Sequence, residues 1–240
     1  MDRLEVKNVD YLIPICVFGE AGVGKTSLIY RFREDLFEEM APTVGVEFTE
    51  KVVTVKDRSV KLQCWDTTGE TRFRSTVKQY FRQKAACSIV ISYDNRESLF
   101  QFENWVTELK ELAHPAAVIT LVVNKCDIPV KERSFSKEEA LSAAEKFDLW
   151  FFECSAKTGT GVAEPFKFIA EEVLRKIELG EVNPMEPSTG IRTNAIRISE
   201  FMLTERTALR DDPGPNSPGF FRKVKNSLKA YLCPKKVRTE

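Results

Sequence analysis

The stretch Gly19-Glu-Ala-Gly-Val-Gly24-Lys25-Thr26 directly follows an apolar run, residues 11–18, and precedes a helical pattern. It satisfies G-x-x-x-x-G-K-[ST], a pattern in which glycines let successive backbone N–H groups point inward at phosphate oxygens. The lysine can reach the β- and γ-phosphates of a nucleotide, and the threonine hydroxyl can bind Mg²⁺. The strand–loop–helix setting therefore predicts a nucleotide-binding loop, with the candidate residues Glu20, Ala21, Gly22, Val23, Gly24, Lys25, Thr26 and Ser27.

Around this loop, short apolar runs alternate with helical patterns as far as residue 179. The expected strands are 11–18, 44–55, 60–65, 86–93, 118–123 and 149–154, and helices are expected directly after Gly24 and over 71–84, 96–113, 137–147 and 161–179. Such alternation predicts a mostly parallel sheet covered by helices on both faces. We therefore predict an α/β fold, a three-layer P-loop NTPase domain over residues 1–179 with a six-stranded sheet. Pro14 breaks the pattern, because it removes a backbone donor from a strand.

Composition excludes several classes of protein. Of 240 residues 42% are hydrophobic, enough for a packed core, and 36 basic residues balance 36 acidic ones, which argues against a nucleic-acid binder. A single histidine and the absence of C-x-x-C pairs leave no ligand set for zinc. The first residues lack a signal-peptide pattern, and no run reaches the roughly 18 apolar residues of a membrane span. A protein of the cytosol, or of membranes facing it, is expected, with its cysteines reduced and mainly buried.

Two further segments indicate which base is bound. Asn124-Lys125-Cys-Asp127 follows an apolar strand, and the carboxyl ends of strands are where ligands dock in open sheets. The Asp127 carboxylate can accept hydrogen bonds from the ring N–H and the exocyclic amine of guanine, a pair of donors that adenine lacks. Ser155-Ala156-Lys157 follows the last strand and offers a backbone N–H to the guanine carbonyl. GTP or GDP is the predicted ligand.

Between these segments lies Trp65-Asp66-Thr67-Thr68-Gly69. Asp66 ends a strand and can hold Mg²⁺ through water, as a Walker-B acid does. Gly69 can bring its N–H against the γ-phosphate with no side chain in the way. Thr43 is placed to close over the γ-phosphate and bind the metal, so Thr26, Thr43 and Asp66 form the predicted metal site.

Taken together, residues 10–178 resemble a small GTPase, and in detail the Rab family, which implies a G domain. The matching segments are Val44-Gly-Val-Glu-Phe48, Lys61-Leu-Gln-Cys-Trp-Asp-Thr-Thr-Gly69, Arg72-Phe-Arg-Ser75 and Tyr80-Phe-Arg82. Phe48, Trp65 and Tyr80 match the aromatic triad through which Rab proteins meet effectors, although ordinary core packing is an alternative for them. The resemblance implies a monomeric switch of vesicle traffic, served by effectors, an exchange factor and a GTPase-activating protein, on the cytosolic face of intracellular membranes.

Catalysis is where the chain departs from that family. Its expected catalytic residues are Lys25, Thr43 and Glu70, but Glu70 replaces the glutamine that orients the attacking water, and a carboxylate cannot donate to the transition state. Thr68 replaces an alanine, and Ala21 stands where small GTPases often have glycine. Slow intrinsic hydrolysis is predicted. A GTP-binding scaffold without hydrolysis is the alternative. A P-loop kinase or ATPase would need a lid that binds a phosphoacceptor and would lack the N-K-x-D motif, so Asp127 argues against that class.

The guanine-stacking residue is ambiguous. The family has an aromatic residue seven positions before the switch threonine, where this chain has Leu36, and Phe37 follows one position later. Phe37 is the candidate, on the expectation that the loop is one residue shorter or the stacking weaker.

The composition changes after residue 179. Residues 180–219 contain five prolines and are predicted to be a disordered linker, and 220–240 to be a basic amphipathic tail. The segment 219–240 carries seven Lys or Arg and one acid, hence a charge of +6. Cys233 lies outside any C-terminal prenylation pattern, so conventional prenylation is not expected. Palmitoylation of Cys233 would add a second membrane-binding signal to the basic segment. The tail is expected to contact an anionic membrane, with a protein partner or simple solvation as alternatives.

Overall fold

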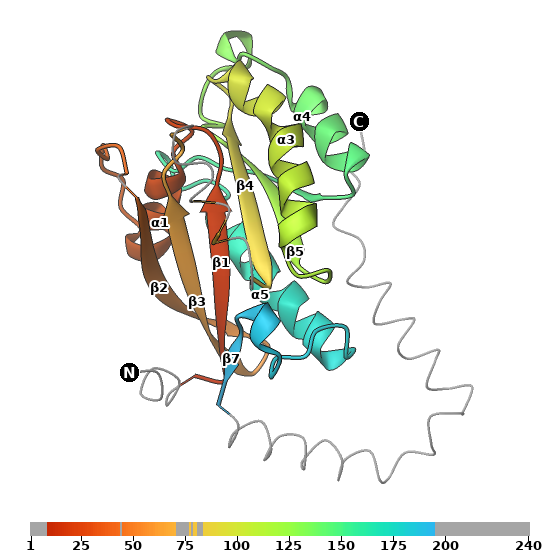
Figure 1. Cartoon of the computed structure of the whole chain (residues 1–240). Helices are drawn as coiled ribbons and strands as arrows, with labels where there is room; N and C mark the ends of the chain where they lie inside the picture. Colours follow the sequence, from red (N-terminus) through yellow and green to blue (C-terminus); the bar gives the residue numbers. More distant parts are fainter. Residues whose placement is uncertain (1–8, 44, 71–76, 78, 81–83, 195–240) are drawn as a thin grey trace, which may run out of the picture. The chain divides into compact units, whose positions relative to one another are not determined.

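The computed structural model describes residues 9–43, 45–70, 77, 79–80 and 84–194. Within them a mostly parallel sheet has the strand order β2-β3-β1-β4-β5-β6, with β7 beside β1 (Figure 1). The parallel pairs are β3–β1, β1–β4, β4–β5 and β5–β6, and β2 and β7 each pair antiparallel with their neighbour. The strand bounds are β1 Tyr11–Phe18, β2 Val46–Val55, β3 Arg58–Thr67, β4 Ala86–Ser92, β5 Val118–Asn124, β6 Trp150–Glu153 and β7 Arg192–Thr193.

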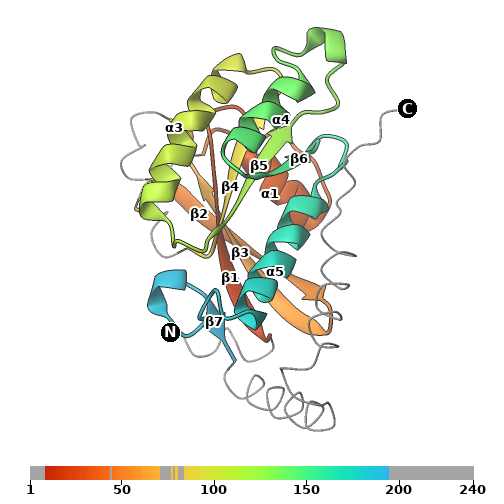
Figure 2. The same ribbon diagram turned by 90° about the vertical axis from the view of Figure 1, so that its right-hand side faces the viewer.

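Two of the helices start where side chains satisfy their first N–H groups. In α3 the Asn95 side chain accepts a hydrogen bond from the Ser98 N–H, and α4 begins with a capping box between Ser136 and Glu139. Figure 2 shows α3 on one side of the sheet and α1 and α5 on the other. The α-helices of the described residues are α1 Lys25–Glu34, α3 Arg96–Leu112, α4 Lys137–Lys146 and α5 Ala163–Glu178, and two 3₁₀ turns cover Val130–Glu132 and Pro187–Thr189.

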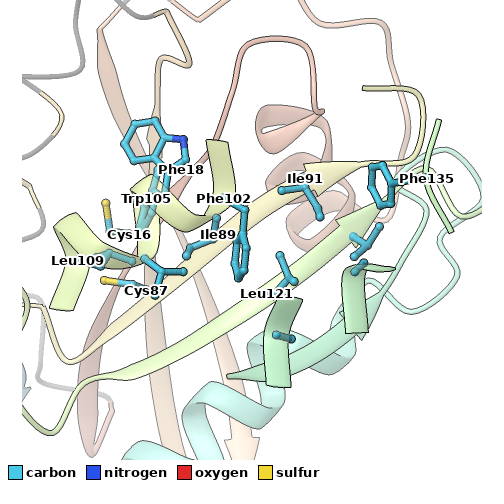
Figure 3. Packing of buried hydrophobic residues seen from close by; sticks show 14 of the residues in the cluster. Cys16, Phe18, Cys87, Ile89, Ile91, Phe102, Trp105, Leu109, Leu121 and Phe135 are labelled. Atoms are coloured by element: carbon cyan, nitrogen blue, oxygen red, sulfur yellow. The ribbon is translucent and has the colours of Figure 1, made fainter. Parts of the chain in front are cut away.

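The core lies on both faces of the central strand β1, all eight residues of which are buried. On one face, Trp105 and other apolar side chains of α3 pack against Phe18 of β1 and the apolar residues of β4 (Figure 3). On the other face, Phe32 of α1 stacks on Phe166 of α5 with ring centroids 4.1 Å apart. A strand buried on both faces reads as a continuous apolar run, which is why its bounds were predictable from sequence.

The cysteines of the described residues are free thiols. Burial raises the pKa of Cys16 and of Cys64 to about 12, so both are small apolar core residues. Cys87 and Cys154 are likewise buried, and Cys126 is half-buried.

The segment after α5 differs from the disordered linker predicted to begin at residue 180. Residues 180–194 continue the folded domain, and β7 adds a seventh strand to the sheet by pairing Tyr11 with Thr193. Val182 and Ile191 are buried, and the fully buried Thr189 donates its hydroxyl to the Glu186 carbonyl at 2.8 Å. These three buried residues attach the segment to the domain, although its average composition, with several prolines, resembles that of a linker. The folded domain therefore extends to residue 194 and not 179.

This extra strand also accounts for Pro14. On that side of β1, β7 pairs with residues 11–12 and β4 with residues 15–18. The Asp10 carbonyl accepts from the Asn194 N–H at 3.1 Å, and alternation along the strand from there directs the Pro14 nitrogen to the same side. The missing donor thus falls in the gap between the two pairings, where the described residues require no ladder hydrogen bond.

The remaining expected elements are confirmed to within a few residues, and the predicted α/β architecture with them. The helix expected over 71–84 lies almost wholly outside the described residues, and so do residues 195–240, which hold the rest of the predicted linker and the whole tail. Among the described residues, no helix combines the length and apolar character that crossing a bilayer requires.

Candidate functional site

The phosphate-binding loop connects β1 to α1 at the carboxyl end of the central strand. Lys25 is buried, and its ammonium donates to the carbonyls of Gly19 and Glu20, at 2.9 Å each. Burial lowers the Lys25 pKa to about 8, while the charges of Asp66 and Glu20 act to raise it. Gly24 has φ +87°, and a Cβ there would lie 2.5 Å from the Asn124 amide nitrogen, so only glycine fits. The loop residues Ala21 and Gly22 are exposed, and Val23 is buried.

The three predicted metal-site residues come together, although they belong to three segments. The Thr26 hydroxyl lies 2.7 Å from the Asp66 carboxylate and 2.7 Å from the Thr43 hydroxyl, which is itself 3.2 Å from the same carboxylate oxygen. The other oxygen, Asp66 Oδ1, is buried and has no hydrogen-bond partner among the described residues, and burial raises the pKa of this carboxyl. Hydroxyls around one buried carboxylate fit Mg²⁺, which binds few protein ligands alongside phosphate oxygens. No cluster of three or more His, Cys, Asp or Glu offers an alternative metal site within the described part of the chain.

The turn after β3 brings Gly69 against the phosphate-binding loop. A Cβ on Gly69 would lie 2.4 Å from the Ala21 nitrogen and 2.6 Å from the Glu20 carbonyl oxygen, so the approach needs glycine. The preceding residue, Thr68, is buried, and its N–H donates to the Gly45 carbonyl at 3.0 Å. Its hydroxyl accepts from the Glu70 N–H at 3.3 Å. Thr68 therefore helps to shape the turn that carries Glu70, a role the sequence did not indicate.

Asn124 and Lys125, in the segment that was predicted to bind the base, both form hydrogen bonds to the phosphate-binding loop. Asn124 is buried at the end of β5 and donates to the Val23 carbonyl at 2.9 Å. Lys125 donates to the Gly22 carbonyl at 2.8 Å and pairs with Asp94 at 2.7 Å. Both residues predicted for base recognition therefore hold the two loops in register.

Asp127 lies at the same edge of the sheet as these two residues. One of its carboxylate oxygens accepts from the Ser155 hydroxyl at 2.5 Å. A carboxylate has about four lone-pair sites, so capacity for two donors of a base is left. The segment Ser155-Ala156-Lys157 was predicted to offer a backbone N–H to the guanine carbonyl, and in this structure the N–H of Ala156 donates to Asn124 Oδ1 at 3.1 Å. The Ser155–Lys157 loop and Asp127 are thus adjacent.

Arg31 is a residue of this site that motif reading missed. From α1 it reaches the Ser155–Lys157 loop, which we call the base-side loop. There Nε donates to the Ala156 carbonyl at 2.9 Å and Nη2 to the Lys157 carbonyl at 2.8 Å. Its third nitrogen donates to the Asp35 carbonyl at 2.7 Å. Arginine occurs on many helix surfaces, so no local sequence signal distinguishes this one. The role of its planar guanidinium can be recognised only once the fold places the loop carbonyls beside it.

Two predicted contacts differ in how far the structure supports them. Phe37 is 39% exposed and Leu36 is 55% exposed in the segment after α1, so neither is held in the core and the stacking residue stays a prediction. The predicted effector residues do cluster: the ring centroids of Phe48 and Trp65 lie 5.2 Å apart and those of Trp65 and Tyr80 5.7 Å apart. Phe48 is 54% exposed, which favours a contact surface over core packing for that residue.

Comparison with known proteins gives a consistent result. A protein-family model described as the Ras family matches residues 14–175. The chain is 40% identical over 174 residues to Ras-related protein Rab-4 of Dictyostelium discoideum, with 72% of this chain and 84% of that protein covered. It is 38% identical over 207 residues to Ras-related protein Rab-4B of Rattus norvegicus, with 86% and 96% covered. It is 39% identical over 184 residues to Ras-related protein Rab-4A of Homo sapiens, with 76% and 84% covered.

Proposed function

The chain belongs to the Ras family and is a Rab-type small GTPase, and from this premise we propose that it binds GTP and GDP with Mg²⁺ as a nucleotide-dependent switch in vesicle traffic. One observation carries the proposal. Lys25, the Thr26–Thr43–Asp66 group and Asp127 come from separate segments of the chain and lie along the carboxyl edge of one parallel sheet. This edge is where open α/β sheets bind ligands.

Each group has a physical task at that edge. Backbone N–H groups of the loop and the Lys25 ammonium bind the phosphates, and Asp127 accepts from the guanine ring N–H and amine. Mg²⁺ supplies positive charge that neutralises the phosphates, and the residues that would hold it are Thr26, Thr43 and, through water, Asp66. Thr43 and Gly69 approach the loop from two different segments, so a γ-phosphate contacted by both would order both.

An exchange experiment tests this proposal. Purified protein is stripped of nucleotide and reloaded in competition between guanosine and adenosine nucleotides, with Mg²⁺ present. We expect a strong preference for guanosine, reduced about 10²-fold or more by Asp127→Asn, because an amide replaces one acceptor by a donor. Asp94→Asn serves as the control, since Asp94 lies beside the same loop but faces Lys125. Equal loading of adenosine and guanosine nucleotides by the wild-type protein would overturn the proposal.

GTPase activity is general in this family, and we propose that here it is intrinsically slow. Glu70 can accept a hydrogen bond from the attacking water but cannot donate one to the transition state, and its charge faces a polyanion. Thr68 adds a buried hydroxyl to the same turn, and Ala21 puts a methyl group on the loop at its closest approach to Gly69. The long-lived GTP form would then be ended by an activating protein that brings its own catalytic residues. A non-hydrolysing scaffold is the second candidate, favoured by the same three residues.

The remaining parts of the proposal concern partners and location. The cluster of Phe48, Trp65 and Tyr80 is proposed as the effector contact, and an exchange factor is expected to open the nucleotide site. We further propose that the protein acts as a monomer on the cytosolic face of intracellular membranes. Contact with anionic lipid would come from the basic segment 220–240, which lies outside the described residues.

A further inference from the structure

The phosphate-binding loop of this protein contains an acid, Glu20, whose side chain is held by a distant helix. Its backbone carbonyl accepts from the Lys25 ammonium, within the loop. Its side chain reaches toward α3 instead, where Oε1 accepts from the Trp105 indole Nε1 at 3.0 Å. The two residues are 85 positions apart in the chain.

Trp105 is well suited to fix the position of that carboxylate. Its side chain is only 3% exposed, and its ring lies 5.5 Å from the Phe18 ring in the core shown in Figure 3. Packing of this kind restricts an indole to one orientation, so the direction of its N–H is set by the core. The hydrogen bond to Glu20 is also favoured because a buried indole N–H without an acceptor costs free energy.

The charge of Glu20 matters because of what the loop is proposed to bind. A carboxylate close to phosphate groups opposes binding, and the opposition grows with the number of phosphate charges. The carboxylate is near enough to the phosphate-binding lysine to help raise the Lys25 pKa against the effect of burial. Glu20 also borders the Gly69 turn through its backbone. A displaced Glu20 would therefore disturb two groups that are proposed to contact the γ-phosphate, the Lys25 ammonium and the Gly69 turn.

We propose that Trp105 is a positioning residue, whose hydrogen bond to Glu20 keeps the carboxylate on the α3 side of the loop and out of the path of the phosphates. The inference rests on the proposed function, since it concerns the affinity of the same loop for nucleotide. It makes α3 part of the nucleotide site without any contact to the ligand. It also predicts that the loss of Trp105 affects GTP more than GDP, because GTP carries the extra phosphate.

Dissociation of fluorescent GDP and of a fluorescent non-hydrolysable GTP analogue, measured on the full chain with Mg²⁺, tests the proposal. Trp105→Phe keeps an aromatic ring but removes the donor. We expect it to speed release of the GTP analogue about tenfold and of GDP about threefold or less. Glu20→Gln keeps an acceptor but removes the charge, so Trp105→Phe added to Glu20→Gln should speed release of neither nucleotide beyond the rate of Glu20→Gln alone. Trp150→Phe is the control, because Trp150 of β6 packs on Phe168 of α5.

The outcomes are separable. Equal acceleration of both nucleotides by Trp105→Phe, undiminished in the Glu20→Gln background, would mean that Trp105 only supports the fold and would overturn the inference. If Trp105→Phe does not fold, ¹⁵N-labelled indole resonances decide: Glu20→Ala should shift the Trp105 N–H signal and Glu20→Gln should shift it far less. An unmoved signal in Glu20→Ala also overturns it. A wild-type protein that binds neither nucleotide would instead refute the proposed function itself.

Discussion

At the scale of single residues, the base-side loop depends on a side chain from another element. Arg31 donates to two loop carbonyls, at 2.9 and 2.8 Å, and so fixes the backbone between Ser155 and Thr158. Charged hydrogen bonds of this kind contribute about 1.5–3 kcal/mol each. We expect Arg31→Ala to speed GDP dissociation by about tenfold or more, with Arg31→Lys intermediate, because an ammonium cannot reproduce the planar fork.

The control for this prediction is a neighbouring arginine on the same helix. Arg33 has an exposed side chain that donates a hydrogen bond to the Thr49 hydroxyl and forms a salt bridge with Glu34. Arg33→Ala should therefore leave GDP release unchanged. Stopped-flow release of fluorescent GDP provides the measurement. If Arg31→Ala and Arg33→Ala behave alike, the base-side loop does not depend on Arg31.

Glu70 and Thr68 lead to a second prediction at this scale. Glu70→Gln restores a side chain that can both accept from water and donate to the transition state. One such donor is worth roughly 10²–10³ in rate, so we expect single-turnover hydrolysis to rise at least about tenfold. Thr68→Ala should have a smaller effect in the same direction, by removing the hydroxyl that holds the Glu70 N–H. Wild-type hydrolysis as fast as that of ordinary Rab proteins would contradict the proposal of a slow enzyme.

The sequence indicated which segments would come together where chemistry fixes both residue type and spacing. Lys25, Thr26 and Asp127 belong to motifs in which phosphate or guanine dictates the donors and acceptors, and the structure brings those segments together. Prediction from sequence failed for Arg31 and Trp105, whose contacts depend on which elements, far apart in the chain, become neighbours in the fold. The use of the Ala156 N–H by Asn124 was equally invisible, because it depends on the geometry between two loops.

At the scale of elements, the strands were the most predictable feature. Strands buried on both faces, such as β1 and β4, are continuous apolar runs and were located almost to the residue. The edge strand β2 is half-exposed, and it starts at Val46 where the sequence predicted a start at 44. The strand β7 was missed, since so short a strand carries no periodicity and its pairing depends on the gap in β1 partners.

The segment 180–194 gives the element-scale prediction. Ile191 is 6% exposed, and its N–H donates to the Thr189 hydroxyl, so it anchors the segment to the domain. Ile191→Ala should lower the free energy of unfolding by about 2 kcal/mol, near the low end for buried isoleucine because the site is at the domain edge. Met185→Ala, in the same segment but 69% exposed, should change it by less than about 0.5 kcal/mol.

Denaturant unfolding of the full chain measures both variants. The expected result is a lower midpoint for Ile191→Ala at an unchanged slope. A midpoint equal to that of wild type would instead support the original expectation of a linker that begins at residue 180.

At the scale of the whole molecule, the chain divides its charge unevenly. The total is zero, yet the segment 219–240 sums to +6, and the segment 1–218 therefore sums to −6. A neutral protein with a strongly basic end has little general attraction for anionic surfaces but a strong local one. The folded domain reaches residue 194, so the stretch 195–218 separates it in sequence from this basic segment.

That separation leads to the last prediction, which concerns membrane contact. Each Lys or Arg near an anionic leaflet contributes about 1 kcal/mol, and the apolar residues of the segment can enter the interface. The full chain should float with liposomes containing phosphatidylserine at moderate salt, whereas a chain ending at residue 218 should not. Replacing Lys235 and Lys236 by glutamine should weaken flotation, and Cys233→Ser should not, because liposomes supply no acyl donor. Equal flotation with and without residues 219–240 would exclude the segment as a membrane anchor, and binding to a protein partner would then be the better account of its charge.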